Sequence, residues 1–304
     1  MNQNMSRRSA LRSLTGGTAA LAAAASLPNS LLAADAPASG RKGNIHHSVC
    51  LWCYGSLMDS QGGRPAKMTF DDFCRECAAM GLQSVELLGP SQWPTVKKAG
   101  LICAMCTSPD SISYGWNRLE HHDVLLPKFE QAIPQVAQNG FPNIITFSGN
   151  RKGMDDQQGL ENCVKGLKRL VPIAEKHKVL VTLELLNSKV DHADYMADHT
   201  AWGVELCKRV DSEWLKLLYD IYHMQIMEGD MIRTITDNHQ FIGHFHTGGV
   251  PGRHEIDETQ EINYAAVMRA IVATGYKGFV SQEFVPKRPD ALASLRQAID
   301  ICDV

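Results

Sequence analysis

Four side chains that can bind a divalent cation occur one by one in successive apolar segments of the second half of the chain. Glu184 lies in LVTLELL, Asp220 in LKLLYDIY, His246 in IGHFHT and Glu283 in GFVSQEF. Three carboxylates and one imidazole suit a divalent ion such as Mn²⁺, Mg²⁺ or Co²⁺. Without a cation, three clustered carboxylates repel one another and take up protons. The four residues therefore predict one metal site, provided that the fold brings them together.

The elements that would position these residues form a regular alternation. Apolar runs rich in β-branched residues alternate with helix-like stretches, which predicts a single-domain (β/α)₈ TIM barrel of the α/β class. The active site of such a barrel lies at the carboxyl ends of its strands. An open doubly wound sheet would call for a glycine-rich phosphate loop, and neither GxGxxG nor GxxxxGK[ST] occurs. The expected strands cover residues 47–54, 82–88, 101–107, 143–147, 180–186, 215–222, 242–247 and 278–284.

The intervening stretches carry helix signals. Thr69 and Asp72 resemble a capping box at the start of one helix, and Gly81 follows its end. Further helices are expected over residues 121–138, 155–177, 200–210, 228–238, 264–274 and 291–302, with a weaker candidate at 91–99.

Other polar residues near the strand ends have alternative interpretations. The segment HTGGVPGRHE holds Arg253, whose guanidinium could bind a carboxylate or a diol, or could lie on an exposed loop. His244 shares a strand face with His246 but lies farther from the strand end, so a neutral core histidine is expected. Glu86 could line a pocket or form a salt bridge in the barrel mouth. Trp52 could stack on a sugar ring, although a place in the wall of the barrel is the simpler expectation.

The amino terminus has the pattern of an export signal. Arg7 and Arg8 precede an uncharged, alanine-rich run, which resembles a twin-arginine signal. A membrane anchor is the alternative, but Gly16 and Gly17 and the weak hydrophobicity of alanine disfavour a stable span. We expect an exported, periplasmic protein without a stable membrane anchor. The predicted organisation is a signal over residues 1–36, a linker over 37–44 and the barrel over 45–304.

Charge and cysteine content narrow the possible partners. The chain carries a formal charge of −3, and the first 36 residues contribute +2, so the remainder carries −5. Nucleic-acid-binding proteins usually present a basic surface, and the net charge of residues 37–304 is negative, so we expect no nucleic-acid partner. Three of the cysteine pairs have CxxC spacing: 50/53, 74/77 and 103/106. Zinc binding is the alternative, but their expected places on strands and a helix favour buried, small apolar side chains without a disulfide framework.

The motifs taken together resemble the hydroxypyruvate isomerase family within the xylose isomerase-like barrels. The resemblance covers the chain from residue 45 onward and depends on LELLN, DIYH, GHFH, GRHE followed by EINY, and QE. It implies that Glu184, Asp220, His246 and Glu283 bind the metal ion. It also implies that Glu184 and Glu283 transfer protons and that His223 and Arg253 bind substrate oxygens.

The resemblance implies a reaction as well. Hydroxypyruvate and 2-hydroxy-3-oxopropanoate (tartronate semialdehyde) would interconvert through an enediolate, with proton transfer by a positioned carboxylate. That family often has Gln where this chain has His246, whereas His is typical of ketose 3-epimerases. A 3-epimerase or another sugar or sugar-acid isomerase with the same metal site is therefore the main alternative.

Two further alternatives are less favoured. An apurinic-site endonuclease needs more metal-binding histidines after its second and third strands, where this chain has LGP and TSP. A non-catalytic barrel would have a broken ligand set, but this set is complete. We expect a small-molecule substrate and a possible homo-oligomer.

Overall fold

The computed structural model describes residues 40–58 and 66–304. The predicted export signal and residues 37–39 of the predicted linker lie outside the described residues. The described residues group as one compact unit, the barrel. Within the described ranges, no helix is both long enough and apolar enough to span a bilayer.

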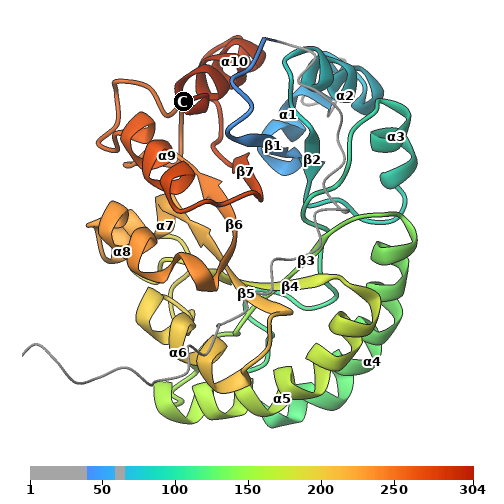
Figure 1. Cartoon of the computed structure of the whole chain (residues 1–304), viewed down its shortest axis with the longest axis vertical. Coiled ribbons are helices and arrows are strands. Elements are labelled where there is room, and N and C mark those ends of the chain that lie inside the picture. The colour runs from blue at the N-terminus through green and yellow to red at the C-terminus, as the bar shows by residue number, and fades with distance from the viewer. Residues whose placement is uncertain (1–39, 59–65) are drawn as a thin grey trace, which may run out of the picture. The chain divides into compact units, whose positions relative to one another are not determined.

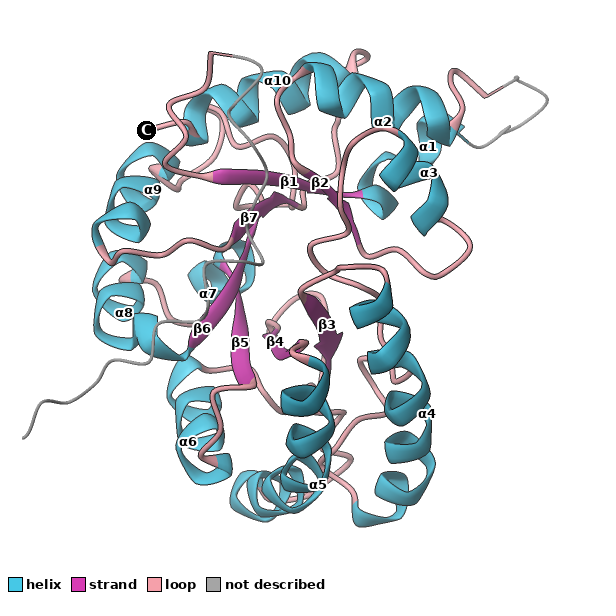
Figure 2. Cartoon of the chain, turned by 45° about the vertical axis from the view of Figure 1, so that its right-hand side comes forward, coloured by secondary structure: helices cyan, strands magenta, loops and turns pink. Residues whose placement is uncertain are grey.

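Seven parallel strands form the inner sheet of the described chain, in the order β2-β1-β7-β6-β5-β4-β3. Figure 1 shows helices surrounding these strands, and Figure 2 shows the strands curling around a common centre. This arrangement confirms the predicted α/β barrel. The strands are β1 (His46–Cys50), β2 (Ser84–Glu86), β3 (Asn143–Thr146), β4 (Leu180–Leu185), β5 (Leu215–Asp220), β6 (Ile242–Thr247) and β7 (Phe279–Gln282).

The segment predicted as a strand over residues 101–107 is irregular, so that prediction is wrong in detail. The segment still fills the gap between β2 and β3 through isolated bridges from Ile102 to Ser84 and from Cys106 to Ile144. At Ala104 the backbone ladder is interrupted, because the Ala104 N–H donates to Ser84 Oγ at 2.9 Å. The Ala104 carbonyl oxygen accepts from Asn143 Nδ2 at 2.8 Å. The side chains of Ser84 and Asn143 thus replace the neighbouring backbone as hydrogen-bond partners of Ala104. The segment still connects β2 to β3 through its isolated bridges.

The helices follow the predicted alternation. Thr69 and Asp72 form the expected capping box at the start of α2, with hydrogen bonds in both directions. The described helices are α1 (Gly55–Met58), α2 (Phe70–Ala79), α3 (Trp93–Lys98), α4 (Leu119–Gln138), α5 (Asp156–His177), α6 (Thr200–Val210), α7 (Ile221–Met227), α8 (Met231–Asn238), α9 (Tyr264–Ala273) and α10 (Ala291–Cys302).

Two boundaries differ from the prediction around β5. The strand expected over residues 215–222 ends at Asp220, and α7 begins directly after it. The Asp220 side chain accepts a hydrogen bond from the Tyr222 backbone N–H at 2.8 Å, which caps that helix. The helix expected from residue 228 begins only at Met231. An aspartate at the end of an apolar strand therefore also starts a helix here.

All nine cysteines lie in the described residues, and each is buried and free of a disulfide. This result confirms that the chain has no disulfide framework. Cys50 ends β1, but Cys53 lies in a 3₁₀ turn and Cys103 in the irregular segment, so the predicted strand positions of these two are wrong. Burial raises the pKa of the Cys74 and Cys207 thiols to about 12. Neutral, buried thiols of this kind act as small apolar side chains.

The start of the described chain is tied to its end at the floor of the barrel, where the strands begin. Arg41 donates to the Met80 carbonyl oxygen at 3.0 Å and pairs with Asp300 at 2.5 Å. Asn44 Nδ2 donates to the Val304 carbonyl oxygen at 2.8 Å. These contacts hold the entry to β1 against the carboxyl-terminal helix.

Candidate active site

The four predicted metal ligands meet at the carboxyl ends of β4 to β7. One ligand atom from each of Glu184, Asp220, His246 and Glu283 lies within 4.8 Å of the others, and all four residues are buried. The sheet register explains the meeting, because Asp220 pairs with His246 across β5 and β6. Glu283 directly follows β7, and its N–H donates to the Thr247 carbonyl oxygen at 3.0 Å. The fold therefore forms the predicted cluster from four neighbouring strands.

Glu283 is the most restrained member of this cluster. Its Oε2 accepts from His246 Nδ1 at 2.7 Å and from Arg253 Nη2 at 2.6 Å. Its Oε1 accepts from the Trp52 indole N–H at 2.8 Å. Burial alone would raise the Glu283 pKa, but the charges of Arg253 and His246 and these hydrogen bonds hold it well below its usual value.

The other two carboxylates behave in the opposite way. Burial, together with the charges of Glu283 and Glu184, raises the pKa of Asp220 to about 8. Burial and the charge of Glu283 also raise the pKa of Glu184. The closest ion-pair partner of Glu184 among the described residues is His246 Nδ1, at 3.5 Å. Without a further positive charge in the cluster, Asp220 and Glu184 therefore tend to keep their protons.

Arg253 reaches this cluster from the loop that follows β6. Its Nη2 lies 3.2 Å from Asp220 Oδ2, and its guanidinium lies 5.2 Å from the ring centres of both Trp52 and Tyr222. Cation–π contacts on two aromatic rings hold the guanidinium in place. Of the alternatives that the sequence leaves open for Arg253, the structure excludes the exposed loop, because the guanidinium lies at the cluster.

Local backbone geometry directs Arg253 inward. Arg253 has a φ of +58°, in the left-handed region that side chains other than glycine seldom adopt. The loop bridges to itself at Gly249 and His254, and a Cβ on Gly249 would lie 2.3 Å from the Glu255 carbonyl oxygen. The Glu255 carboxylate accepts from the backbone N–H groups of Lys287 and Arg288 at 3.0 and 3.1 Å. These bonds anchor the loop to the segment that precedes α10, so the strained conformation of Arg253 is held in place.

His223, a predicted substrate ligand, lies behind the cluster and does not line the cavity. Its Nδ1 accepts from the Asn187 backbone N–H at 3.2 Å, and burial followed by the charge of Arg253 holds its pKa well below the usual value. His223 is therefore neutral and carries its proton on Nε2. That Nε2 is buried, lacks a hydrogen-bond partner among the described residues, and lies 3.5 Å from Asp220 Oδ2. It remains a donor available to an oxygen atom placed at the cluster.

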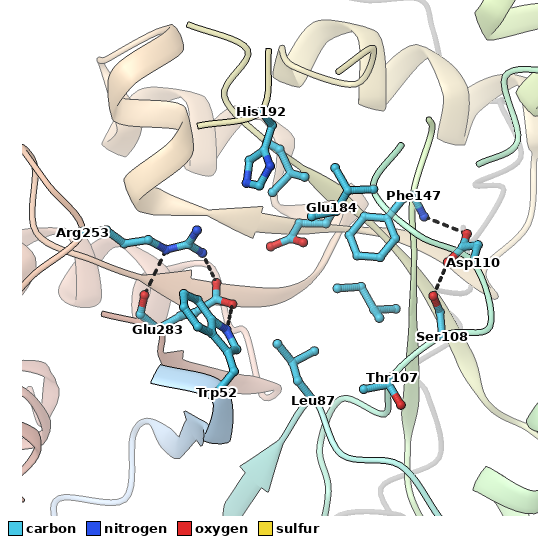
Figure 3. A pocket seen from close by; sticks show the side chains of 13 residues that line it. Trp52, Leu87, Thr107, Ser108, Asp110, Phe147, Glu184, His192, Arg253 and Glu283 are labelled. Carbon is cyan, nitrogen blue, oxygen red and sulfur yellow. Dashed lines mark hydrogen bonds and ion pairs between the residues drawn. The ribbon is translucent and has the colours of Figure 1, made fainter. Parts of the chain in front are cut away.

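A cavity of about 430 Å³ opens onto this cluster. Figure 3 shows Arg253 and Trp52 both reaching the Glu283 carboxylate, with Glu184 pointing into the same space. The apolar part of the wall consists of Leu87, Ile112, Ile145, Phe147 and Leu186. The polar part consists of Thr107, Ser108, Asp110, Glu184, His192, Arg253 and Glu283, and Trp52 completes the lining.

Sequence reasoning missed several of these lining residues. Trp52, for which the sequence allows either stacking on a sugar ring or a place in the wall, does line the cavity, but its hydrogen bond to Glu283 is not foreseen. His192 lies in the loop after β4 and Asp110 in the loop after the irregular segment, and no motif singles them out. Burial raises the pKa of Asp110 to about 7 despite donors from Ser108, Thr146 and the Phe147 backbone. Only the fold shows that these loops converge on one cavity.

The structure also settles the position of Glu86. This residue ends β2, is fully buried and does not line the cavity. Its Oε1 accepts from His244 Nε2 at 3.0 Å and from His246 Nε2 at 2.8 Å. Of the two expectations for Glu86, the salt bridge is therefore the one that the geometry supports.

The fold and the site define a class of protein. The sequence model of the xylose isomerase-like TIM barrel family matches residues 74–302, so the chain belongs to that family. Two solved structures share the fold. A 3-keto-D-glucoside 4-epimerase of Escherichia coli has a TM-score of 0.67 at 19% identity, covering 84% of this chain and 98% of that one. A D-psicose 3-epimerase of Clostridium cellulolyticum has a TM-score of 0.66 at 17% identity, covering 86% and 100%.

The relatives identified by sequence carry the names of particular isomerases. A putative hydroxypyruvate isomerase of Danio rerio is 31% identical over 124 residues, which are 41% of this chain and only 45% of that protein. A protein of the same name from Homo sapiens is 26% identical and covers 76% of this chain and 87% of its own length. A 2-oxo-tetronate isomerase of Pectobacterium atrosepticum is 25% identical and covers 72% and 87%. These relatives identify the chain as an isomerase.

Proposed function

We propose that this chain is a metal-dependent isomerase that interconverts hydroxypyruvate and 2-hydroxy-3-oxopropanoate. The observation that carries the proposal is the convergence of Glu184, Asp220, His246 and Glu283 within 4.8 Å, with Arg253 beside them. The names of the sequence relatives support an oxo-acid substrate.

The cluster fits a divalent cation. Three carboxylates and an imidazole supply hard oxygen donors and one nitrogen, which suit Mn²⁺, Mg²⁺ or Co²⁺. A cation would offset the repulsion that raises the pKa of Asp220 and Glu184. Glu184, Asp220, His246 and Glu283 would hold it, and when bound it supplies Lewis-acid stabilisation of the negative charge that develops on the substrate oxygens.

Proton transfer falls to the two glutamates of the cluster. Glu184 and Glu283 lie on β4 and just after β7, which are separated in the sheet by β5 and β6. A substrate lying across the ends of β5 and β6 would have one carboxylate on each side. A proton leaves C3 of hydroxypyruvate to give an enediolate and returns to C2, while the hydroxyl proton moves from O3 to O2. No redox partner is needed, because these shifts alone convert one compound into the other.

The two glutamates differ in how they are held, which suggests different parts in this transfer. Glu283 is fixed by Trp52, His246 and Arg253, whereas Glu184 has a raised pKa and few partners. Glu184 has the fewer hydrogen-bond donors among the described residues, so its carboxylate is the freer of the two to accept the substrate proton. Glu283, held by its hydrogen bonds, faces the substrate from the opposite side as the second proton-transfer carboxylate.

Arg253 and His223 would bind the substrate. The Arg253 fork can pair with a carboxylate that lies directly beside the reacting carbons. The unpartnered Nε2 of His223 can donate to a substrate oxygen at the cluster. A neutral ketose lacks the carboxylate, so Arg253 favours an oxo acid as the substrate.

One observation favours a second candidate with a longer substrate. The cavity measures about 430 Å³, and much of its wall is apolar. At about 30 Å³ of liquid volume per water-sized group, the seven non-hydrogen atoms of hydroxypyruvate fill at most about 210 Å³, less than half of the cavity. A longer sugar acid or a ketose would fill more of the space, and a 3-epimerase or related isomerase could use the same cluster.

Proton exchange followed by NMR tests the proposal. Protein loaded with Mg²⁺ is incubated in D₂O with hydroxypyruvate and, in parallel, with longer oxo acids and free ketoses. We expect deuterium entry and 2-hydroxy-3-oxopropanoate formation, both lost in Glu283→Gln. Exchange with a ketose alone would transfer the mechanism to a sugar substrate. The absence of exchange with every compound, despite bound metal, would refute the catalytic role.

We also propose that residues 1–36 direct export to the periplasm, on the strength of Arg7, Arg8 and the alanine-rich run that follows. Fractionation of cells that express the whole chain tests this, with Arg7→Lys and Arg8→Lys together as the variant. Export by the twin-arginine route predicts that the variant stays in the cytoplasm. Unchanged periplasmic recovery would contradict it.

A further inference from the structure

A buried carboxylate lies next to the cluster but outside the chemistry described so far. Glu86 at the end of β2 is fully buried, and each of its oxygens has a partner. Ser48 Oγ donates to Oε2 at 2.7 Å. His244 Nε2 and His246 Nε2 lie 3.0 and 2.8 Å from Oε1. Three donors, one on β1 and two on β6, thus hold this carboxylate beside His246.

The two nitrogens of His246 face different groups. Nε2 points to Glu86, whereas Nδ1 points to Glu283 at 2.7 Å and to Glu184 at 3.5 Å. A neutral imidazole can bind a metal ion through one nitrogen only if the proton is on the other. In the structure Nδ1 donates to Glu283, and a cation would take the place of that proton. The carboxylate at Nε2 would keep the remaining proton there, so that the Nδ1 lone pair faces the cluster.

We propose that Glu86 is a positioning residue that accepts the Nε2 proton of His246 and so presents Nδ1 as the metal ligand. The inference rests on the proposed metal dependence, but it adds a residue from β2 to a site formed by β4 to β7. Ser48 and His244 would in turn hold Glu86 in its orientation. Glu86 itself touches neither the cavity nor the substrate.

A second metal ion is the competing explanation for the same residues. Glu86, His244 and His246 offer three buried ligand atoms within 4.8 Å of one another. However, the nitrogen-to-oxygen distances of 2.8 and 3.0 Å are those of direct hydrogen bonds. Ser48 also occupies the second oxygen of Glu86. The hydrogen-bonded network therefore accounts for the group without an ion, and the number of bound ions decides between the two.

The test compares Glu86→Ala and Glu86→Gln with the whole wild-type chain. Titration calorimetry with Mn²⁺ gives the affinity and the number of ions, and the absorption spectrum with Co²⁺ reports the ligand geometry. We expect one ion per wild-type chain and an affinity about 10–100-fold weaker in Glu86→Ala. Glu86→Gln keeps one acceptor oxygen, so its affinity should lie between the two. If the alanine variant does not fold, the glutamine variant decides.

Asp198→Asn is the matched control. Asp198 is also a buried carboxylate beside a histidine, with His199 Nδ1 at 2.7 Å, but it lies in the loop before α6. We expect it to bind Mn²⁺ like the wild type. Folded Glu86 variants with wild-type affinity and an unchanged Co²⁺ spectrum would overturn the inference. Two ions in the wild type and one in the Glu86 variants would replace it with the second metal site.

Nitrogen-15 NMR of the metal-free protein separates this inference from the proposed function. We expect a slowly exchanging proton on His246 Nε2, lost in Glu86→Ala. A wild-type chain that shows this proton but binds no divalent ion would refute the proposed metal dependence. A wild-type chain that binds the ion without a proton on Nε2 would refute the role of Glu86 alone.

Discussion

The indole N–H of Trp52 donates to Glu283 Oε1 at 2.8 Å, although nearly half of the Trp52 side chain is exposed at the cavity. Trp52 follows β1 and Glu283 follows β7, and these two strands are neighbours in the sheet. One carboxylate of the cluster is therefore oriented by a residue that a substrate can also touch. This relationship gives the first of four predictions.

Trp52→Phe should lower kcat/KM for the proposed substrate by about tenfold while leaving the fold intact. The variant keeps an aromatic ring but removes a hydrogen bond to a charged group, which contributes about 1.5–3 kcal/mol. Steady-state kinetics and the melting temperature measure the two effects. Trp202→Phe, on α6, is the control and should change neither. Unaltered kinetics in Trp52→Phe would mean that Glu283 is held without the indole.

Glu184→Gln and Glu283→Gln should each lower kcat by at least about 100-fold, because positioned general acids and bases contribute about 10²–10⁴ in rate. Each amide keeps an oxygen for metal binding but cannot accept a proton at neutral pH. Single-turnover kinetics on metal-loaded protein measure the loss. Glu261→Gln, on the exposed part of the loop after β6, serves for comparison. A kcat within a few-fold of wild type in Glu184→Gln would remove this residue from the proton path.

Arg253→Lys should separate acidic from neutral substrates. Lysine keeps a positive charge near Glu283 and Asp220 but lacks the planar fork that binds a carboxylate through two hydrogen bonds. We expect kcat/KM for hydroxypyruvate to fall about 10–100-fold, and that for a neutral ketose to fall much less. Arg209→Lys, on α6, controls for the loss of an arginine. Equal losses for both substrates would show that Arg253 acts through the cluster and not through a substrate carboxylate.

Metal binding should release protons and become tighter as the pH rises toward 8. Burial raises the pKa of Asp220 to about 8, so without a cation this group is largely protonated at pH 7. The ion must displace that proton, and the apparent affinity should rise with pH until Asp220 is ionised, then level off. Titration calorimetry in two buffers with different ionisation enthalpies counts the protons. An affinity for Mn²⁺ that does not change between pH 6 and 8 would contradict the raised pKa.

Periodicity and strand-end position were enough to predict the barrel and the meeting of the four cluster residues. Glu184, Asp220, His246 and Glu283 each lie at or next to the end of an apolar run, and parallel strands bring such ends together. The irregular segment around Ala104 could not be predicted, because Ser84 and Asn143, which are distant in sequence, break the ladder there.

The contacts of Glu86 and Arg253 could not be predicted from the sequence for a related reason. Glu86 lies on a three-residue strand, and its partners Ser48, His244 and His246 come from two other strands. Nothing local distinguishes a glutamate that faces a cavity from one that faces two imidazoles. Arg253 was predicted from the chemistry of its loop, but its left-handed backbone and its position between two aromatic rings follow from tertiary contacts.

The contacts of Arg41 and Asn44 with α10 and the carboxyl terminus have a practical consequence for work with this protein. They bring the chain into the barrel at the end where the strands begin, whereas the cavity opens where the strands finish. An affinity tag or fluorescent reporter fused ahead of Arg41 thus joins the barrel on the side away from substrate entry. Removing those contacts should destabilise the end of the barrel where the strands begin and leave the arrangement of the four cluster residues unchanged.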